Sequence, residues 1–225
     1  MPRAVYDISV PDLYEVERAL GDMKSKAPRA MKNAINQTAT RSRSMMLRKA
    51  RLRYALSTAG RRHINQLKLK NRATESNLSA ELFISSRAAD LADFKTNPNE
   101  PHMGMEWVLS PEYHKTKVLK SSPMKKLTGG STDEGQVSKG FLVRFDSGHV
   151  AMVQRLINKP TKATPKPTRW KNKNGIVERL RVMPTPSASA MHSVTWREEV
   201  EPLSAEILQE RLQHEVDKIL SKRKG

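Results

Sequence analysis

The chain has 225 residues, of which 37% are hydrophobic, so one modest core with extended loops around it is expected. Lysine and arginine number 41 against 23 aspartate and glutamate, and this formal charge of +18 implies an anionic partner: nucleic acid, an acidic protein surface or a membrane face. The absence of cysteine excludes a disulfide framework, thiol catalysis and cysteine-ligated metal sites.

The N-terminal segment predicts an extended arm followed by a short helix. The first ten residues are expected to be extended, and the apolar spacing of Leu13, Val16 and Leu20 predicts a helix that ends near Gly21. We therefore interpret 1–23 as an N-terminal arm and short helix that precede the main domain.

A long amphipathic helix is the main predicted element. Ser25 stands where an N-cap is needed, and Pro28 falls in the first turn, where a missing N–H costs nothing. Neither Gly nor Pro interrupts the chain from there to about Leu56, and Gly60 is expected to end or kink the helix. Its predicted buried stripe consists of Met31, Ile35, Thr38, Ser42, Met45, Leu52 and Leu56.

This helix region has an unusual charge pattern. Between Asp22 and Glu75 the chain has no acidic residue, although a solvated helix face normally mixes signs to gain ion pairs one turn apart. The repulsion between its cations needs an offset, so we expect an anionic partner for this region. The candidate contacts with that partner or with DNA are Arg41, Arg43, Arg48, Lys49, Arg51, Arg53, Arg61 and Arg62.

Short strands are predicted in the middle of the chain. Alternating residues favour a strand over 78–84, and further candidates lie at 107–109 and 116–119. The segment 95–105 is expected to be a loop, and 125–139, which is rich in Gly, Ser and Thr, is expected to be a mobile loop.

The clearest predicted hairpin comes next. The β-prone runs 141–145 and 149–155 flank an Asp-Ser-Gly turn, which predicts an antiparallel pair with Gly148 at a positive φ. A basic, proline-containing loop is predicted over 158–174, and a last strand over 176–183.

The C-terminal part predicts two helices. Ser187 or Ser189 is expected to cap the first, and Pro202 begins the second, which is acidic until its last turn as the helix dipole favours. This acidic helix is a candidate partner for the basic N-terminal helix, either within one chain or between subunits. Residues 221–225 are expected to be a basic tail.

The sequence has no pattern that indicates catalysis. Its six histidines match no metal-ligand spacing, and His149 is best interpreted as a turn-lining side chain. The pair Gly129-Gly130 lies in a polar loop and not between a strand and a helix. The acid pairs at 133–134 and 198–199 are adjacent, so on a helix they do not converge. We expect no enzyme activity and no cofactor.

Nucleic acid and membrane are the two alternatives to a protein partner. The basic helix fits nonspecific contact with phosphates, but the sequence has no helix-turn-helix, zinc-finger or RNP signature. Trp170 is the one tryptophan placed to stack on a base, and an anchor for a partner protein is at least as good an interpretation of it. Small residues dominate the apolar stripe and no stretch approaches about 20 apolar residues, so no membrane partner is expected. The start of the chain lacks the apolar run of a secretory signal.

Several short motifs follow one another in order along the chain. The helix start at 27–39 contains the pattern AP-x-A-x-x-x-AIN, and the later motif residues are 67–70 with Ala73, 78–80, 91–94, 117–120, Phe141, Ser147, Gly148, His149, Val150, Gln154, Arg155 and 184–187. In this order they resemble the phage minor tail protein Z family of tail-completion proteins. The basic segment 159–173 stands in place of that family's R-x-P-I stretch, and Thr185 replaces the Gly of its GPS turn.

The resemblance implies an α+β fold in which a long N-terminal helix packs on a small antiparallel sheet, with C-terminal helices and extended loops. The domain would span 24–220, with basic loop insertions at 120–140 and 158–175. The hairpin residues 147–150 would form an interface, and no catalytic or ligand residue carries over.

The implied function is that of a structural virion protein at the head-proximal end of a phage tail, needed for head–tail joining and assembled in the host cytoplasm. Its expected partners are further copies of itself in a ring, for which a hexamer is one candidate, and the tail terminator, tail tube and head–tail connector proteins. The alternative is a nonspecific DNA-binding protein that contacts the phage genome at the head–tail junction.

Overall fold

The protein has mixed α and β structure in two compact units. The computed structural model describes residues 3–9, 13–85, 91–101, 113–145, 148, 150–160, 178–183 and 185–222. One unit, here unit 1, comprises residues 1–50, 64–87 and 187–225, and unit 2 comprises 51–63 and 88–186. The long N-terminal helix, the small antiparallel sheets and the C-terminal helices confirm the predicted α+β class.

Unit 1 contains a three-stranded antiparallel sheet. Its strands follow the order β1 (Arg3–Ser9), β3 (Ser79–Ser85) and β2 (Lys68–Asn71). Alternation places Tyr6 and Ile8 on the buried face, next to Leu82 and Ala80 of the neighbouring strand. The sequence predicted β3 closely but suggested only an extended arm at β1, which pairs with β3 along its whole length.

Three helical segments follow the first strand, and the chain kinks between the first and the third, where Gly21 has a φ of 53° and Met23 has non-helical backbone angles. They are α1 (Leu13–Leu20), the 3₁₀ segment η1 (Gly21–Lys26) and α2 (Ala27–Arg53). The predicted N-cap at Ser25 is wrong, because η1 continues directly into α2 and Ser25 lies inside it. Small side chains, among them Ala30 and Ala34, dominate the buried side of α2, so its neighbours can approach closely.

The C-terminal helices form one continuous run. Ser187 accepts a hydrogen bond from the amide of Ala190 and so caps α5 (Ala188–Thr195), as predicted. A π-helical turn, η4 (Trp196–Val200), leads into α6 (Glu201–Ser221).

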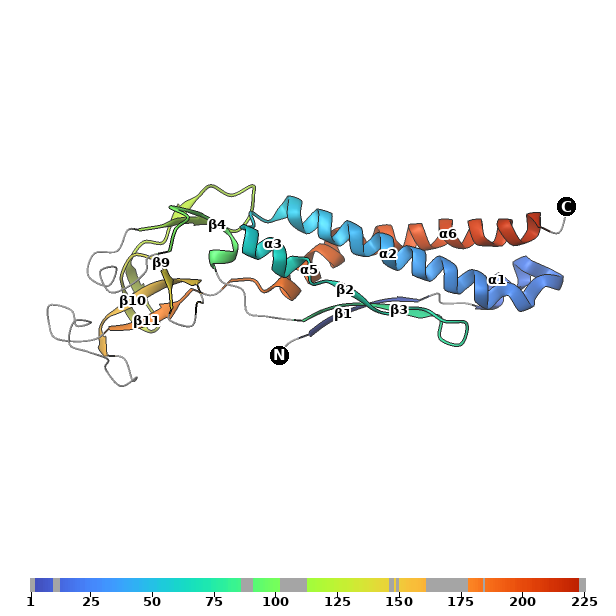
Figure 1. Ribbon diagram of the computed structural model, residues 1–225, viewed down its shortest axis with the longest axis horizontal. Helices are drawn as coiled ribbons and strands as arrows, with labels where there is room; N and C mark the ends of the chain where they lie inside the picture. The colour runs from blue at the N-terminus through green and yellow to red at the C-terminus, as the bar shows by residue number, and fades with distance from the viewer. Residues whose placement is uncertain are drawn as a thin grey trace. The chain divides into compact units, whose positions relative to one another are not determined.

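The helix α6 lies beside α2 and runs in the opposite direction (Figure 1). Asn33, early in α2, contacts Glu215 late in α6, whereas Ser42 further along α2 contacts Ser204. The predicted pairing of the basic and acidic helices therefore takes place within one chain. Val16, Leu20 and Met31 pack with Val216 where α1, α2 and α6 meet.

Unit 2 contains the helical turn η2, most of α3 and two small sheets. One sheet has the order β4-β5-β6, and the other has the order β11-β10-β8-β7 with β9 also paired to β10. The elements are α3 (Thr58–Ile64), η2 (Leu91–Asp93), β4 (Lys95–Asn97), β5 (Lys115–Lys117), β6 (Lys125–Lys126), β7 (Gly130–Thr132), β8 (Gly135–Val137), β9 (Phe141–Arg144), β10 (Val150–Pro160) and β11 (Glu178–Val182).

The predicted hairpin is confirmed as β9 and β10. The two strands are antiparallel, from the pair Phe141 and Val153 to the pair Arg144 and Val150, and Gly148 in the turn has a φ of 78°. Phe141, Val143, Ala151 and Val153 form the buried cluster of this sheet.

Two loop predictions in unit 2 are wrong within the described residues. The segment 125–139 contains β6, β7 and β8, and 95–105 begins with β4. Strands β7 and β8 pair around the turn at 133–134, with Gly135 at a φ of 120° and Val137 buried. The turn-forming composition predicts one loop, whereas the turns connect short strands: β7 and β8 pair with each other, β6 pairs with β5, and β8 also pairs with β10.

Candidate functional site

The eight cations predicted to meet an anionic partner are divided between the units, and two of those in unit 1 have internal partners. The Nε of Arg43 donates to the carbonyl of Leu67 at 2.8 Å. The ammonium of Lys49 lies 3.2 Å from the carboxylate of Glu199. These side chains fasten α2 to neighbouring segments of unit 1, which reduces what they can offer to another molecule.

Arg41 and Arg48 make up an exposed arginine face on α2. They lie seven residues apart, so they are on one side of the helix and about 10 Å apart along its axis. Neither makes an ion pair within the part of the chain that the structure describes. Thr40 and Ser44 on the same side donate their hydroxyls back to carbonyls of the helix itself.

The other four predicted cations belong to unit 2. The guanidinium of Arg53 lies 6.0 Å from the centre of the Tyr54 ring. Arg61 and Arg62 are exposed on α3, and Arg51 is exposed at the end of α2. The eight residues are therefore not one continuous site within a single unit.

Of the predicted hairpin interface, the structure describes Gly148 and Val150. Gly148 is exposed and its amide donates to the carbonyl of Phe145 at 2.8 Å, whereas Val150 is half-buried. Ser147 and His149 lie outside the described residues, as does Trp170. The predicted strand at 107–109 and most of the basic loop at 158–174 lie outside them too.

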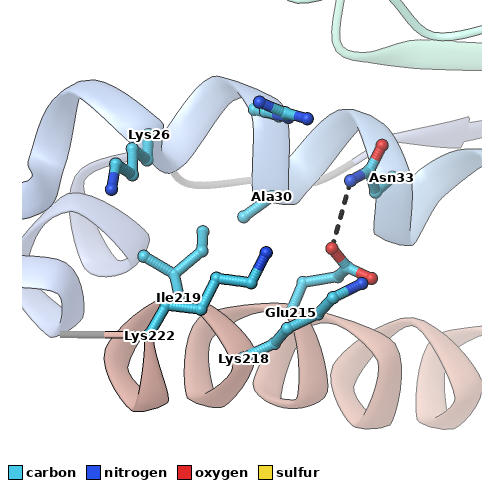
Figure 2. A pocket seen from close by; sticks show the side chains of 8 residues that line it. Lys26, Ala30, Asn33, Glu215, Lys218, Ile219 and Lys222 are labelled. Carbon is cyan, nitrogen blue, oxygen red and sulfur yellow. Dashed lines mark hydrogen bonds between the residues drawn. The ribbon is translucent and has the colours of Figure 1, made fainter. Parts of the chain in front are cut away.

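A pocket in unit 1, which sequence analysis did not identify, lies between the start of α2 and the end of α6 (Figure 2). Its volume is about 200 Å³. Four cations surround it, two from the segment where η1 meets α2 and two from the end of α6, and Ala30 and Ile219 supply apolar surface. We call it the α2–α6 pocket, and its cations are Lys26, Arg29, Lys218 and Lys222.

The α2–α6 pocket also contains one carboxylate, that of Glu215, whose side chain is only 6% exposed. Asn33 Nδ2 donates to its Oε2 at 3.1 Å, and Gln37 Nε2 donates to its Oε1 at 3.2 Å. These neutral amides satisfy the carboxylate oxygens without adding positive charge. The lining therefore carries four formal positive charges against one negative charge.

The acidic residues of α6 do not neutralise the basic helix beside it. Glu206, Glu210 and Asp217 are exposed, and the contacts between α2 and α6 include neutral ones such as the 2.7 Å bond between the hydroxyls of Ser42 and Ser204. Helix pairing thus leaves these three carboxylates facing solvent, whereas Glu215 faces α2 and is bonded there by neutral amides. The sequence showed the opposite charges but not which sides of the helices would meet.

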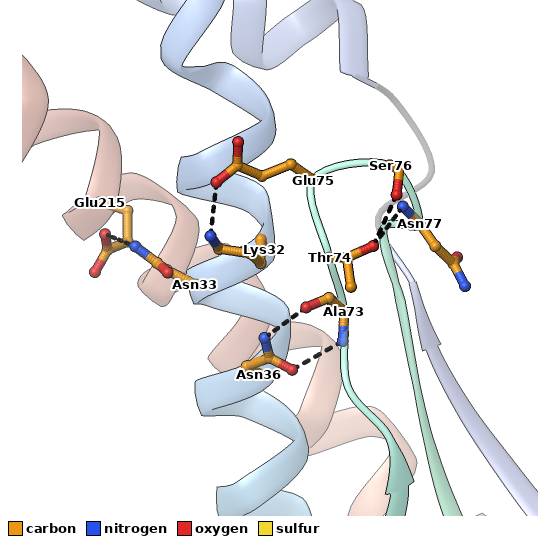
Figure 3. Close-up of polar contacts among 9 residues, drawn as sticks. All are labelled: Lys32, Asn33, Asn36, Ala73, Thr74, Glu75, Ser76, Asn77 and Glu215. Atoms are coloured by element: carbon orange, nitrogen blue, oxygen red, sulfur yellow. Dashed lines mark hydrogen bonds and ion pairs between the residues drawn. The ribbon is translucent and has the colours of Figure 1, made fainter.

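Polar contacts join the other side of α2 to the connection between β2 and β3 (Figure 3). The Asn36 side chain donates to the carbonyl of Ala73 and accepts from its amide, both at 3.0 Å. Lys32 lies 2.7 Å from Glu75, and this hydrogen bond and charge lower the pKa of the Glu75 carboxyl. Asn36 therefore closes a two-bond bridge between the helix and the sheet.

Two histidines of the described residues, the buried His192 and the half-buried His63, contact other parts of the protein. His192 Nε2 lies 3.0 Å from the carbonyl of Ile64, so this nitrogen carries the proton, and Nδ1 is buried without a hydrogen-bond partner among the described residues. Burial lowers the pKa of His192. In unit 2, His63 Nδ1 lies 3.0 Å from Asp93 Oδ2. No group of three potential ligands suited to a metal occurs among the described residues.

Comparisons of the chain with protein-family models, with curated proteins and with solved structures find no match. Among the described helices, none combines the length and the apolar character that a membrane span requires.

Proposed function

We propose that the chain is a structural virion protein that completes the head-proximal end of a phage tail and allows the tail to join the head. In this proposal it acts by binding, as a ring of copies that meets tail-terminator, tail-tube or head–tail connector proteins, and it has no catalytic role. The ordered motifs of the sequence are its starting point, and the internal contacts of each unit support it.

The observation that carries the proposal is that two separate motifs meet in unit 1. Asn36 belongs to the first motif and Ala73 to the second, and they form the two-bond bridge between α2 and the sheet. The two residues are 37 positions apart in the sequence, and both belong to motifs that resemble the same family. Their direct hydrogen bonding supports a shared fold, because motifs that matched by chance would have no reason to meet.

Further motif residues make contacts that hold separate segments of unit 2 together. Phe94 is fully buried and Asp93 contacts His63, so the motif at 91–94 attaches η2 to α3. Gln154 is buried, and its side-chain amide donates to the carbonyls of Thr128 and Ser138. These positions hold backbone segments together, which gives a physical reason for the motif residues.

Complementation of a phage that lacks this protein tests the proposal. Without it, micrographs should show filled heads and separate full-length tails, and the wild-type protein supplied in trans should restore joined particles. Joined particles that instead lose their genome would contradict a role in tail completion. Mass measurement of the purified protein tests whether copies assemble into a ring. A protein that stays monomeric at virion-assembly concentrations would contradict the ring.

Nonspecific DNA binding is the second candidate, and the exposed arginine face of Arg41 and Arg48 favours it. A filter-binding titration on duplex DNA should then show affinity that falls steeply with salt. Replacing both arginines with glutamine should reduce the magnitude of the logarithmic salt slope by about 2, one for each phosphate contact. An unchanged slope would remove these residues from any DNA contact.

A further inference from the structure

We propose that the α2–α6 pocket binds an acidic segment of another protein, in which carboxylate side chains flank an apolar one. This inference goes beyond the proposed function and depends on the pocket alone, so it does not require the phage setting. It assigns a specific place and a specific chemistry to the anionic partner that the charge of the chain implies.

The charge of the pocket comes from four exposed cations that make no ion pair among the residues that the structure describes: Lys26, Arg29, Lys218 and Lys222. The Lys26 ammonium donates to the thioether sulfur of Met23 at 3.8 Å, and the charge of Arg29 helps to lower the pKa of the Glu75 carboxyl. Lys218 and Lys222 are one turn apart on α6, and Lys26 at the end of η1 and Arg29 in the first turn of α2 have nearly the same spacing. The antiparallel helices thus bring two like-charged pairs to one hollow, which costs stability unless an anion is shared between them.

The shape of the pocket favours a peptide over a phosphate backbone. Ala30 and the half-buried Ile219 give it apolar surface between the cations, as Figure 2 shows. A volume of about 200 Å³ is far more than one water molecule needs, so a side chain can enter. Phosphates have no apolar part to cover this surface, whereas a leucine between glutamates covers it while its neighbours meet the cations.

The Glu215 carboxylate gives the pocket a direction. Its oxygens are engaged by Asn33 and Gln37 at one end of the lining, so a bound carboxylate is repelled from that end. The ligand's acids should therefore sit towards Lys26 and Lys222. Glu215→Gln should strengthen peptide binding, because rotated amides of Asn33 and Gln37 can keep the hydrogen bonds while the repulsion disappears.

The test uses the full-length chain and the peptide Glu-Glu-Leu-Glu-Glu-amide, labelled with fluorescein on its N-terminal amine, and binding is followed by fluorescence anisotropy at low salt. The pocket variant carries Lys26→Gln and Lys222→Gln, and the matched control carries Arg41→Gln and Arg48→Gln. Both remove two exposed cations, so their net charges are equal. The pocket variant should bind the peptide about fivefold to tenfold more weakly, and the control should stay within about twofold of wild type.

A second peptide with Ser in place of Leu tests the apolar contact and should bind more weakly than the first. A labelled duplex DNA is measured in parallel and should lose no more affinity in the pocket variant than in the control. Equal losses of peptide binding in both variants would overturn the proposal, because they indicate only overall charge. A selective loss of DNA binding in the pocket variant would overturn it in favour of a phosphate site. Neither result bears on head–tail joining, which the complementation experiment measures separately.

Discussion

Removing the Asn36 side chain isolates the bridge between α2 and the sheet of unit 1. In Asn36→Ala, the amide and the carbonyl of Ala73 both lose their partner, and Ala73 is only 4% exposed. Each bond contributes about 0.5–1.5 kcal/mol net, and each buried group left unpaired costs about 1–3 kcal/mol. Because Asn36 itself is half-buried, water can reach part of the gap, so we expect a total loss of about 2–4 kcal/mol.

A matched substitution elsewhere in the same unit serves as the control. Asn71 donates to Glu81 at 2.6 Å, but both groups are exposed at the edge of the sheet, so Asn71→Ala should cost less than about 1 kcal/mol. The two variants lose the same side-chain atoms, but Asn36 lies in α2 and Asn71 in β2. Alanine is a better helix former than asparagine, which offsets part of the loss at Asn36, so a larger loss there is attributable to the buried bridge.

Urea unfolding followed by Trp196 fluorescence is the suitable assay. Trp196 belongs to unit 1, where its ring lies 5.3 Å from that of Tyr6, and Trp107→Phe and Trp170→Phe remove the signals of the other tryptophans. The midpoint should fall markedly for Asn36→Ala and little for Asn71→Ala at an unchanged slope. Equal shifts for the two variants would refute the reasoning that the bridge couples helix and sheet.

Three further substitutions test individual features. Burial lowers the pKa of His192 below its unfolded value of 6.5, so the unfolded chain binds more protons and stability is lost as the pH falls below about 6.5. In His192→Gln the melting temperature should therefore depend less on pH between about 5 and 7. An unchanged pH dependence would contradict this reasoning. In Gly60→Ala the new Cβ would lie 2.0 Å from the Asp93 carbonyl oxygen, so we expect a cost of about 1–3 kcal/mol by thermal unfolding, against little for Gly130→Ala, where nothing lies within 4 Å. Ser187→Ala should cost about 1 kcal/mol through loss of the cap, while Ser187→Asp should retain most stability in the same urea assay; equal losses would argue against capping.

Local patterns in the sequence were sufficient for the elements whose signals lie within a few residues. The apolar spacing of Met31 and Ile35 predicted α2, and the turn residue Gly148 predicted the β9–β10 hairpin together with its positive φ. Ser187 was one of two predicted caps for the same reason, since an N-cap bonds within its own first turn, and Ser189 lies inside α5. The long run without acidic residues predicts an anionic partner, and this stays a prediction.

Other elements depend on backbone pairing between segments that are apart in the sequence. Tyr6 lies in a full strand because β3, more than seventy residues away, supplies its hydrogen bonds. Within 125–139, β7 and β8 form a local hairpin, but β6 also needs β5 and β8 also pairs with β10. The sequence showed that one helix is basic and the other acidic. Only the packing of α2 on α6 determined that they meet through Ser42, Ser204 and the amides around Glu215, and that Lys26 and Lys222 are left around an open pocket. The physical reason is that the charge of each side chain can be read from the sequence, whereas the helix faces that pack together depend on which side chains are buried in the folded unit.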